Sequence, residues 1–76
     1  MLEIRPNCER CDCDLAVDSN EAMICSFECT FCRDCGEGPL AFICPNCGGE
    51  LVARPIRPAS ALARYPASTK RVPGTT

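Results

Sequence analysis

Eight of the nine cysteines follow a spacing that is typical of a chain that binds two metal ions. The register is Cys8-x2-Cys11-x13-Cys25-x3-Cys29-x2-Cys32-x2-Cys35-x8-Cys44-x2-Cys47. Two thiolates separated by two residues can bind one tetrahedral Zn²⁺ from a tight turn, and four thiolates complete a structural site. The even set of eight therefore predicts two sites of four cysteines each.

A disulfide framework is the first alternative, because short cysteine-rich chains are often secreted. A secretory signal has a basic start and an apolar run of about 7 to 15 residues. Charges and a proline interrupt residues 1–6, and no stretch approaches the roughly 20 apolar residues of a membrane span. We therefore expect a cytoplasmic location, where thiols stay reduced and can bind metal. The odd number of cysteines also fits poorly with complete disulfide pairing.

The length allows one small domain, and a domain of this size commonly needs a metal or another staple. A fully packed domain would bury Phe27 and Phe42 and leave Tyr65 exposed. The candidate core up to residue 53 is Leu2, Ile4, Leu15, Val17, Met23, Ile24, Phe27, Phe31, Leu40, Phe42, Ile43, Leu51 and Val52. Because these side chains are few, the chain without metal should be largely unfolded. We expect a small metal-stabilised domain with little regular secondary structure.

The composition changes after Ala53. Residues 54–76 contain no cysteine and no acidic residue, but they hold four prolines and five cations. This composition is typical of a flexible tail, within which residues 59–64 could form only a transient helical turn. The sequence therefore predicts a two-zinc domain over residues 1–53 and a basic tail over residues 54–76.

The charge is divided in the same way. Residues 1–53 carry all ten acidic residues and three of the eight basic ones, and the whole chain has a formal net charge of −2. Each zinc bound by four deprotonated thiolates adds further negative charge to this body. Nucleic-acid binding needs a positive surface, so we expect no nucleic-acid partner.

Local patterns place short elements around the cysteines. Residues 22–24 read as a strand, and residues from Phe31 to about Glu37 as a short helix that ends at Gly36 or Gly38. Residues 40–43 and 51–54 are predicted as two further strands on either side of the second Cys-x2-Cys turn.

The ligand order resembles that of RING-type domains, with cysteine where those domains usually have histidine. The stretch Cys29-Thr30-Phe31-Cys32-Arg33-Asp34-Cys35 is similar to the part of a RING domain from its fourth ligand to its sixth. The resemblance implies an interleaved cross-brace. In that arrangement Cys8, Cys11, Cys32 and Cys35 hold one zinc ion, and Cys25, Cys29, Cys44 and Cys47 hold the other.

Sequential pairing of the cysteines is the alternative. It occurs in zinc ribbons and treble clefs, which the stretch Cys44-Pro45-Asn46-Cys47-Gly48 also resembles. Metal chemistry permits either pairing. Iron can also bind four thiolates, but two separate mononuclear sites without redox partners favour zinc.

The chain is also similar to a family of short bacterial cysteine-rich proteins known only as a domain of unknown function. The likeness runs from Met1-Leu2-Glu3-Ile4-Arg5-Pro6-Asn7-Cys8 through Ile24-Cys25-Ser26-Phe27-Glu28-Cys29 to Cys44-Pro45-Asn46-Cys47-Gly48-Gly49-Glu50-Leu51. It covers roughly the first 58 residues. The resemblance implies a bacterial origin and no particular activity.

An enzymatic role is not expected. The RING resemblance raises the possibility of a ubiquitin-ligase-like adaptor. Such ligases usually have an apolar residue, a bulky aromatic and a cation at three places, where this chain has Arg10, Phe42 and Gly48. Pro45 alone agrees with the ligase pattern. Fold likeness does not carry function with it. A catalytic zinc keeps an open position, whereas eight thiolates close both sites, and the chain has no histidine.

Cys13 lies outside the register of eight. It stands between Asp12 and Asp14, whose charges disfavour a thiolate. It is either an incidental free thiol or a spare ligand that exchanges with Cys11.

The favoured function is a structural zinc-binding module for protein interaction, monomeric by default, with an unidentified protein partner and no membrane. Its tail would bind an acidic partner or its own acidic body, or would only aid solubility. Thiol-based zinc buffering or redox sensing is the competing function, because oxidation releases metal from thiolate sites.

Overall fold

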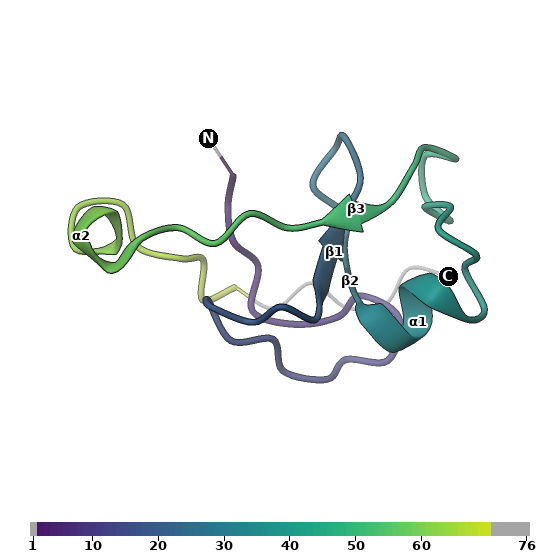
Figure 1. Ribbon diagram of the computed structural model, residues 1–76, viewed down its shortest axis with the longest axis horizontal. Helices are drawn as coiled ribbons and strands as arrows, with labels where there is room; N and C mark the ends of the chain where they lie inside the picture. Colours follow the sequence, from purple (N-terminus) through teal and green to yellow (C-terminus); the bar gives the residue numbers. More distant parts are fainter. Residues whose placement is uncertain (1, 71–76) are drawn as a thin grey trace.

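The computed structural model describes residues 2–70, and its centre is a small antiparallel sheet (Figure 1). The elements follow in the order β1 (Ala22–Ile24), β2 (Thr30–Cys32), α1 (Arg33–Glu37), β3 (Val52–Ala53) and α2 (Ala59–Leu62). β1 is the central strand, since β2 and β3 pair with it on either side. All residues of β1 and β2 are buried, so these two strands form the middle of the domain. The strand predicted at residues 22–24 and the return strand after Leu51 are confirmed.

Helix α1 packs closely on the sheet. It follows β2 directly, with Cys32 as the residue before its first turn, and it ends at Gly38. A Cβ atom at Gly36 would lie 2.7 Å from the sulfur of Met23 in β1, so a larger residue there would require the Met23 side chain to move. The close packing places Cys35, within the helix, against the core. The predicted short helix is thus confirmed from Arg33 onward, whereas Phe31 and Cys32 belong to β2.

The strand predicted at residues 40–43 is wrong. Residues 40–42 form turns, Ile43 makes only an isolated bridge with Glu50, and the backbone N–H of Ile43 donates to the carbonyl of Leu40 at 2.9 Å. Ala41 and Phe42 have φ angles of 49° and 61°, which an extended strand does not allow. The turns carry the chain back from the end of α1 and bring Cys44 to the sheet.

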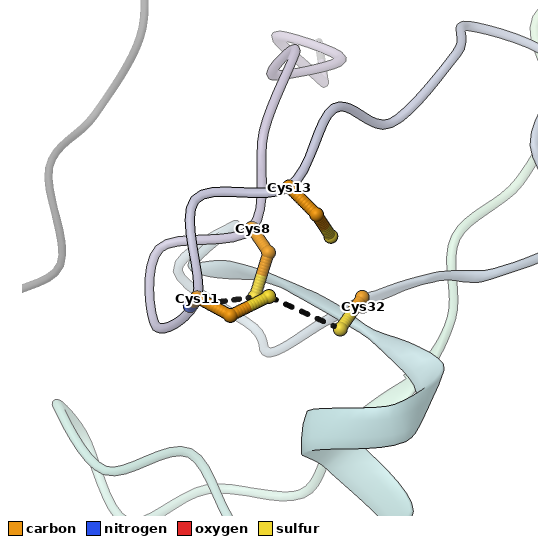
Figure 2. A group of neighbouring side chains, drawn as sticks. All are labelled: Cys8, Cys11, Cys13 and Cys32. Atoms are coloured by element: carbon orange, nitrogen blue, oxygen red, sulfur yellow. Dashed lines mark hydrogen bonds between the residues drawn. The ribbon is translucent and has the colours of Figure 1, made fainter.

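A tight loop at residues 6–15, the first knuckle loop, carries three cysteines (Figure 2). The N–H of Cys8 donates to the carbonyl of Cys13, and the N–H of Asp12 donates to the carbonyl of Cys8, both at 2.9 Å. Asp12 has a φ of 63°. Asp is one of the few residues with a side chain that tolerates this left-handed conformation.

Residues 42–51, the second knuckle loop, repeat this backbone. The N–H of Cys44 donates to the carbonyl of Gly49, and the N–H of Gly48 donates to the carbonyl of Cys44, both at 2.8 Å. Gly48 has a φ of 76° and corresponds to Asp12 of the first loop. The two loops therefore present their Cys-x2-Cys pairs in the same way.

Each knuckle loop is closed by a leucine that enters the core. The N–H of Leu15 donates to the carbonyl of Pro6 at 2.8 Å, and the N–H of Leu51 donates to that of Phe42 at 2.9 Å. Leu15 and Leu51 are both buried. The leucines attach both loops to the same hydrophobic cluster.

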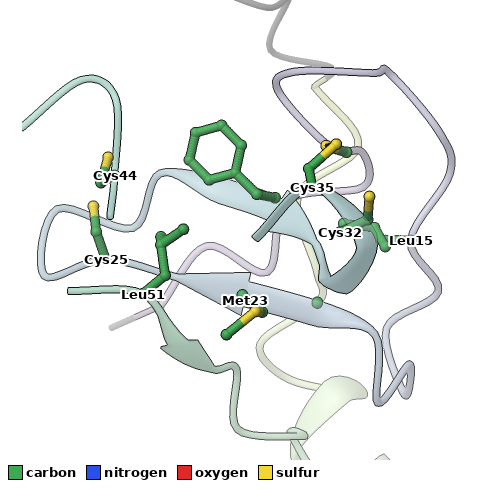
Figure 3. Close-up of a cluster of buried hydrophobic side chains, with 10 residues drawn as sticks. Leu15, Met23, Cys25, Cys32, Cys35, Cys44 and Leu51 are labelled. Carbon is green, nitrogen blue, oxygen red and sulfur yellow. Dashed lines mark hydrogen bonds between the residues drawn. The ribbon is translucent and has the colours of Figure 1, made fainter. Parts of the chain in front are cut away.

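The core lies between two groups of cysteines. Figure 3 shows Cys25 and Cys44 at one end of the buried cluster and Cys32 and Cys35 at the other, with Met23 and Leu51 between them. The cysteine side chains are part of this core rather than a layer outside it. Metal binding at either end would therefore be coupled directly to packing.

Several of the predicted core residues are exposed. Phe27 is 72% exposed and Phe42 46%, so the expectation that they are buried is wrong. Buried cysteines make up much of the core instead. Tyr65 is exposed, as predicted. The candidate core residues divide into a buried set (Ile4, Leu15, Met23, Ile24, Phe31, Leu51), a partly buried set (Leu2, Leu40) and an exposed set (Val17, Phe27, Phe42, Ile43, Val52).

Glu9 connects the two knuckle loops through the sheet. Its carboxylate is 3% exposed, accepts the N–H of Thr30 in β2 at 2.6 Å and pairs with Arg5 at 2.8 Å. Its other oxygen accepts the side-chain amide of Asn46 in the second knuckle loop at 3.5 Å. These partners satisfy a charge that burial alone would make costly.

The described part of the basic segment contacts the beginning of the chain. Arg54 is buried and donates to the carbonyls of Arg5 and Ala16 at 2.8 and 3.2 Å. Arg57 donates to the carbonyl of Leu2. Helix α2 is a single turn at the end of the molecule away from α1 (Figure 1). The domain boundary predicted after residue 53 stays a prediction.

Within residues 2–70, the structure contains no helix that is both long enough and apolar enough to cross a membrane.

Candidate metal centres

Five cysteine sulfurs gather at the first of two candidate metal centres. The Sγ atoms of Cys8, Cys11, Cys13 and Cys32 all lie within 4.8 Å of one another, and their side chains converge in Figure 2. The sulfurs of Cys11 and Cys32 are 3.7 Å apart. Cys35 joins this group, because its sulfur lies 3.8 Å from that of Cys8. The first centre thus combines the first knuckle loop with the junction of β2 and α1.

The second centre is formed by the second knuckle loop and the turn between β1 and β2. The sulfurs of Cys25, Cys44 and Cys47 lie within 4.8 Å of one another. Cys29 belongs to the same group, since its thiol interacts with those of Cys25 and Cys44. The turn that carries Cys25 and Cys29 is closed by a backbone hydrogen bond of 3.2 Å between them.

The structure therefore brings together every cysteine that the sequence analysis assigned to a site. Cys8 and Cys11 lie beside Cys32 and Cys35, and the other group consists of Cys25, Cys29, Cys44 and Cys47. The two groups alternate along the chain. Each could hold a metal ion, and the assignment of particular ligands to each ion stays a prediction.

Backbone N–H groups point at sulfur atoms in both centres. The N–H groups of Arg10 and Cys11 approach the sulfur of Cys8 at 3.4 and 3.5 Å. Gly49 donates to Cys47 at 3.4 Å, and Phe27 donates to Cys25 at 3.3 Å. Such bonds stabilise a thiolate over a thiol, and a thiolate is the form that binds metal.

Two thiols have lowered pKa values. Hydrogen bonding from the backbone of Cys13, with further hydrogen bonds from neighbouring thiols, lowers the pKa of Cys11 to about 6. Burial alone would raise the pKa of Cys25, but hydrogen bonds from the backbone of Phe27 and of Cys29 lower it overall. Each centre thus contains at least one cysteine whose pKa is lower than that of an ordinary thiol.

Three thiols have pKa values well above the ordinary range and resist ionisation. Desolvation, followed by the neighbouring thiols, raises the pKa of Cys35 and of Cys13 to about 12. Desolvation likewise raises the pKa of Cys29 to about 11. Several thiolates in one place repel each other unless a cation neutralises them. A bound metal ion would supply that charge and displace the protons.

In each knuckle loop, the residue before the second cysteine contacts a cysteine that the β1–β2–α1 segment contributes to the same centre. Arg10 donates from its guanidinium to the sulfur of Cys35 at 3.8 Å, and this contact lowers the pKa of that thiol. Asn46 holds the corresponding position, and its side chain lowers the pKa of Cys29. One centre therefore has a cation beside its sulfurs where the other has a neutral amide.

Sequence reasoning missed the equivalence of the two knuckle loops, although it gave a spare ligand as one of two alternatives for Cys13. The signal was present, because both loops read Cys-x2-Cys-x2-acid-Leu, from Cys8 to Leu15 and from Cys44 to Leu51. Aligning the two stretches places Cys13 opposite Gly49. The contribution of Glu9 had no such signal, since its burial depends on partners far away in the sequence.

The sequence matches a known protein family. Residues 1–57 match the family described as "Protein of unknown function (DUF1272)". The chain belongs to this family. The match agrees with the family resemblance predicted for roughly the first 58 residues.

A relative of this DUF1272 protein is "Uncharacterized protein R02474" from Rhizobium meliloti (strain 1021). The two chains are 68% identical over 72 residues, which is 95% of this chain and 86% of the relative. No solved structure matches the chain. Function must therefore be argued from the site itself.

Proposed function

We propose that this DUF1272 protein is a structural zinc module, whose two ions each join two distant parts of the chain and together create the folded domain. The sulfur geometry carries this proposal. Four sulfurs placed about 2.3 Å from a central zinc in a tetrahedron are about 3.8 Å from one another. The separations of 3.7 Å between Cys11 and Cys32 and 3.8 Å between Cys8 and Cys35 match that value.

In the proposed arrangement the sites are interleaved. Cys8, Cys11, Cys32 and Cys35 bind one zinc ion, and Cys25, Cys29, Cys44 and Cys47 bind the other. The order of the cysteines in the two groups supports a RING-like cross-brace over sequential pairing, because each ion would then link one knuckle loop to the β1–β2–α1 segment. All-thiolate tetrahedral ligation is typical of structural zinc rather than of a catalytic site with an open position.

The size of the hydrophobic core supports a folding role for the metal. Few large apolar side chains are buried, and buried cysteines occupy much of the core. A structural zinc contributes about 10–16 kcal/mol in small metal-binding peptides. This is comparable with the whole stability of a typical small domain, about 5–15 kcal/mol. The protein without metal should therefore be unfolded.

The proposed partner is a protein that binds apolar side chains near the second centre. Phe27 projects from the turn between Cys25 and Cys29, and Phe42 and Ile43 directly precede Cys44; all three are exposed. A domain that builds its core from cysteines leaves these side chains free for contact. Large exposed aromatic residues are enriched in protein interfaces.

Native mass spectrometry of the protein purified without added metal tests the proposal. We expect two zinc ions per chain, and loss of amide NMR dispersion when a strong chelator removes them. Returning zinc should restore the dispersed spectrum. A well-dispersed spectrum after complete removal of metal would contradict the proposed scaffold.

The pairing is tested separately with ¹¹³Cd in place of zinc. Scalar coupling between each ¹¹³Cd nucleus and the β-protons of its ligands identifies the cysteines bound to that ion. We expect one resonance to couple with Cys8, Cys11, Cys32 and Cys35, and the other with the remaining four cysteines. Coupling of Cys8 and Cys11 to the same ion as Cys25 and Cys29 would instead show sequential pairing.

A further inference from the structure

The first centre has more sulfur atoms than a tetrahedral ion can use. Cys13 contributes a fifth sulfur, which lies within 4.8 Å of those of Cys8, Cys11 and Cys32 and faces them in Figure 2. Its side chain comes from the same knuckle loop as two of the proposed ligands. Cys13 is thus part of the centre rather than an isolated surface thiol.

Comparison of the two knuckle loops shows that their common backbone aims this position at the metal centre. Gly49 of the second loop corresponds to Cys13, and a Cβ atom built on Gly49 would lie only 3.3 Å from the sulfur of Cys47. A side chain at this place in the knuckle is therefore directed at the second cysteine of the Cys-x2-Cys pair. The first loop carries a thiol there, and the second carries only hydrogen.

Cys11 and Cys13 are also the exposed members of the first centre, whereas Cys8, Cys32 and Cys35 are buried. A cavity of about 270 Å³ is lined in part by Cys13, Cys32 and Arg33. Small reagents can therefore reach the sulfur of Cys13 from solvent. The three buried sulfurs would hold the ion while the two exposed ones compete for the remaining position.

We propose that Cys11 and Cys13 share one coordination position of the first metal centre, so that the centre keeps its ion when either thiol is chemically blocked. The exchange is balanced. One thiol releases its proton to water and binds the ion as a thiolate, while the other leaves the ion and takes up a proton. The proposal rests on the zinc module proposed above, and it adds a thiol that can react with soft electrophiles without unfolding the domain.

Metal counting in serine variants tests the shared position. Cys11→Ser and Cys13→Ser should each retain two ions, because the other thiol fills the position, while the double variant should retain one. Cys47→Ser is the matched control, since it removes the cysteine equivalent to Cys11 from a centre without a fifth thiol. It should lose one ion.

The equivalence of the loops allows a gain-of-ligand variant. Adding Gly49→Cys to Cys47→Ser places a thiol in the second loop where the first loop has Cys13. The smaller serine also relieves the close approach at this position. We expect the double variant to recover the ion that Cys47→Ser loses, and failure to recover it would count against the proposed direction of this side chain.

Limited alkylation of the metal-loaded wild-type protein gives a second readout that needs no variant. One equivalent of iodoacetamide should modify Cys11 in some molecules and Cys13 in others, with two ions retained. Modification confined to Cys13, together with loss of an ion in Cys11→Ser, would overturn the shared position. If the wild-type protein holds fewer than two ions, the zinc module itself fails first, so the two proposals can be distinguished.

Discussion

The two knuckle loops share a backbone but differ in the side chains around it. Both have the same backbone hydrogen bonds, a positive φ after the second cysteine, and a buried leucine at the end. The first loop surrounds its cysteines with Arg10, Asp12 and Cys13, and the second has Asn46, Gly48 and Gly49 at these places. The same backbone therefore presents two sulfurs in both loops. We expect any difference between the two centres to come from the surrounding side chains.

Because of this difference, we expect a structural role for the second loop and an additional chemical role for the first. The second loop has the minimal composition for a tight turn, with small or rigid residues at the positions that carry no ligand. The first loop adds a cation and a spare thiol to the same turn. If the comparison is right, equivalent substitutions should have equal effects wherever the loops agree and unequal effects wherever they differ.

The largest effects are expected for the first cysteine of each loop, and these effects should be similar in the two loops. Cys8 and Cys44 are 0% and 1% exposed, so Cys8→Ser and Cys44→Ser should each lose one ion and most native structure. A structural zinc contributes about 10–16 kcal/mol, which is comparable with the whole free energy of unfolding of a typical small domain. Native mass spectrometry and amide NMR dispersion check this. Ser60→Ala, an exposed change in α2, is the control and should keep both ions.

The leucines that end the loops come next. Leu15→Ala and Leu51→Ala should each destabilise the metal-loaded protein by about 2–5 kcal/mol, because both remove a buried side chain and leave a cavity. Leu51 is 2% exposed and lies near α1, so its substitution should have the larger effect. Urea unfolding at saturating zinc measures both values. A negligible loss for either variant would mean that its loop is attached to the domain by metal alone.

Much of this site could be predicted from the sequence, because a knuckle is a local structure. The register of Cys8 to Cys47 was enough to predict two groups of sulfurs, and the short elements next to the cysteines (β1, α1 and β3) are also local. The core could not be predicted in the same way. Hydrophobicity predicts that Phe27 and Phe42 are buried, but both are exposed, and cysteines from distant segments make up much of the buried cluster.

Other features depend on tertiary context that no local pattern records. The turns at residues 40–42 replace a predicted strand because the chain must reverse between Cys35 and Cys44 to join both centres. Burial of Glu9 requires Arg5 and Thr30 together. A charged residue between two cysteines would otherwise be expected on the surface.

A smaller and unequal effect is expected where the loops adopt the left-handed conformation. Gly48→Ala should cost about 1–2 kcal/mol, since alanine at a positive φ brings its Cβ close to the backbone. Asp12→Gly should change stability less, because relief of that strain offsets loss of the 2.9 Å hydrogen bond from Asn7 to Asp12. Thermal unfolding of the metal-loaded variants measures this difference. Equal destabilisation by both changes would show that the two positions are not equivalent.

The smallest effects are expected on the pH at which each centre releases its metal ion, and they should differ between the two centres. Arg10 lowers the pKa of Cys35, and Asn46 lowers that of Cys29. Removing either donor raises the pKa of its thiol, so protons compete better with metal and release begins at a higher pH. Changes to groups that contact metal ligands typically reduce affinity by about 10- to 100-fold.

Arg10→Ala should therefore raise the pH at which the first centre releases its ion, and Asn46→Ala should do the same at the second centre. The shift should be larger for Arg10, because a charged donor stabilises a thiolate more strongly than a neutral amide does. Metal release followed by ¹¹³Cd NMR during acid titration resolves the two ions. If Arg10→Ala instead shifted the resonance assigned to the second centre, Arg10 and Asn46 would not be equivalent. The two knuckle loops would then share a backbone but differ in how they contact the cysteines of the β1–β2–α1 segment.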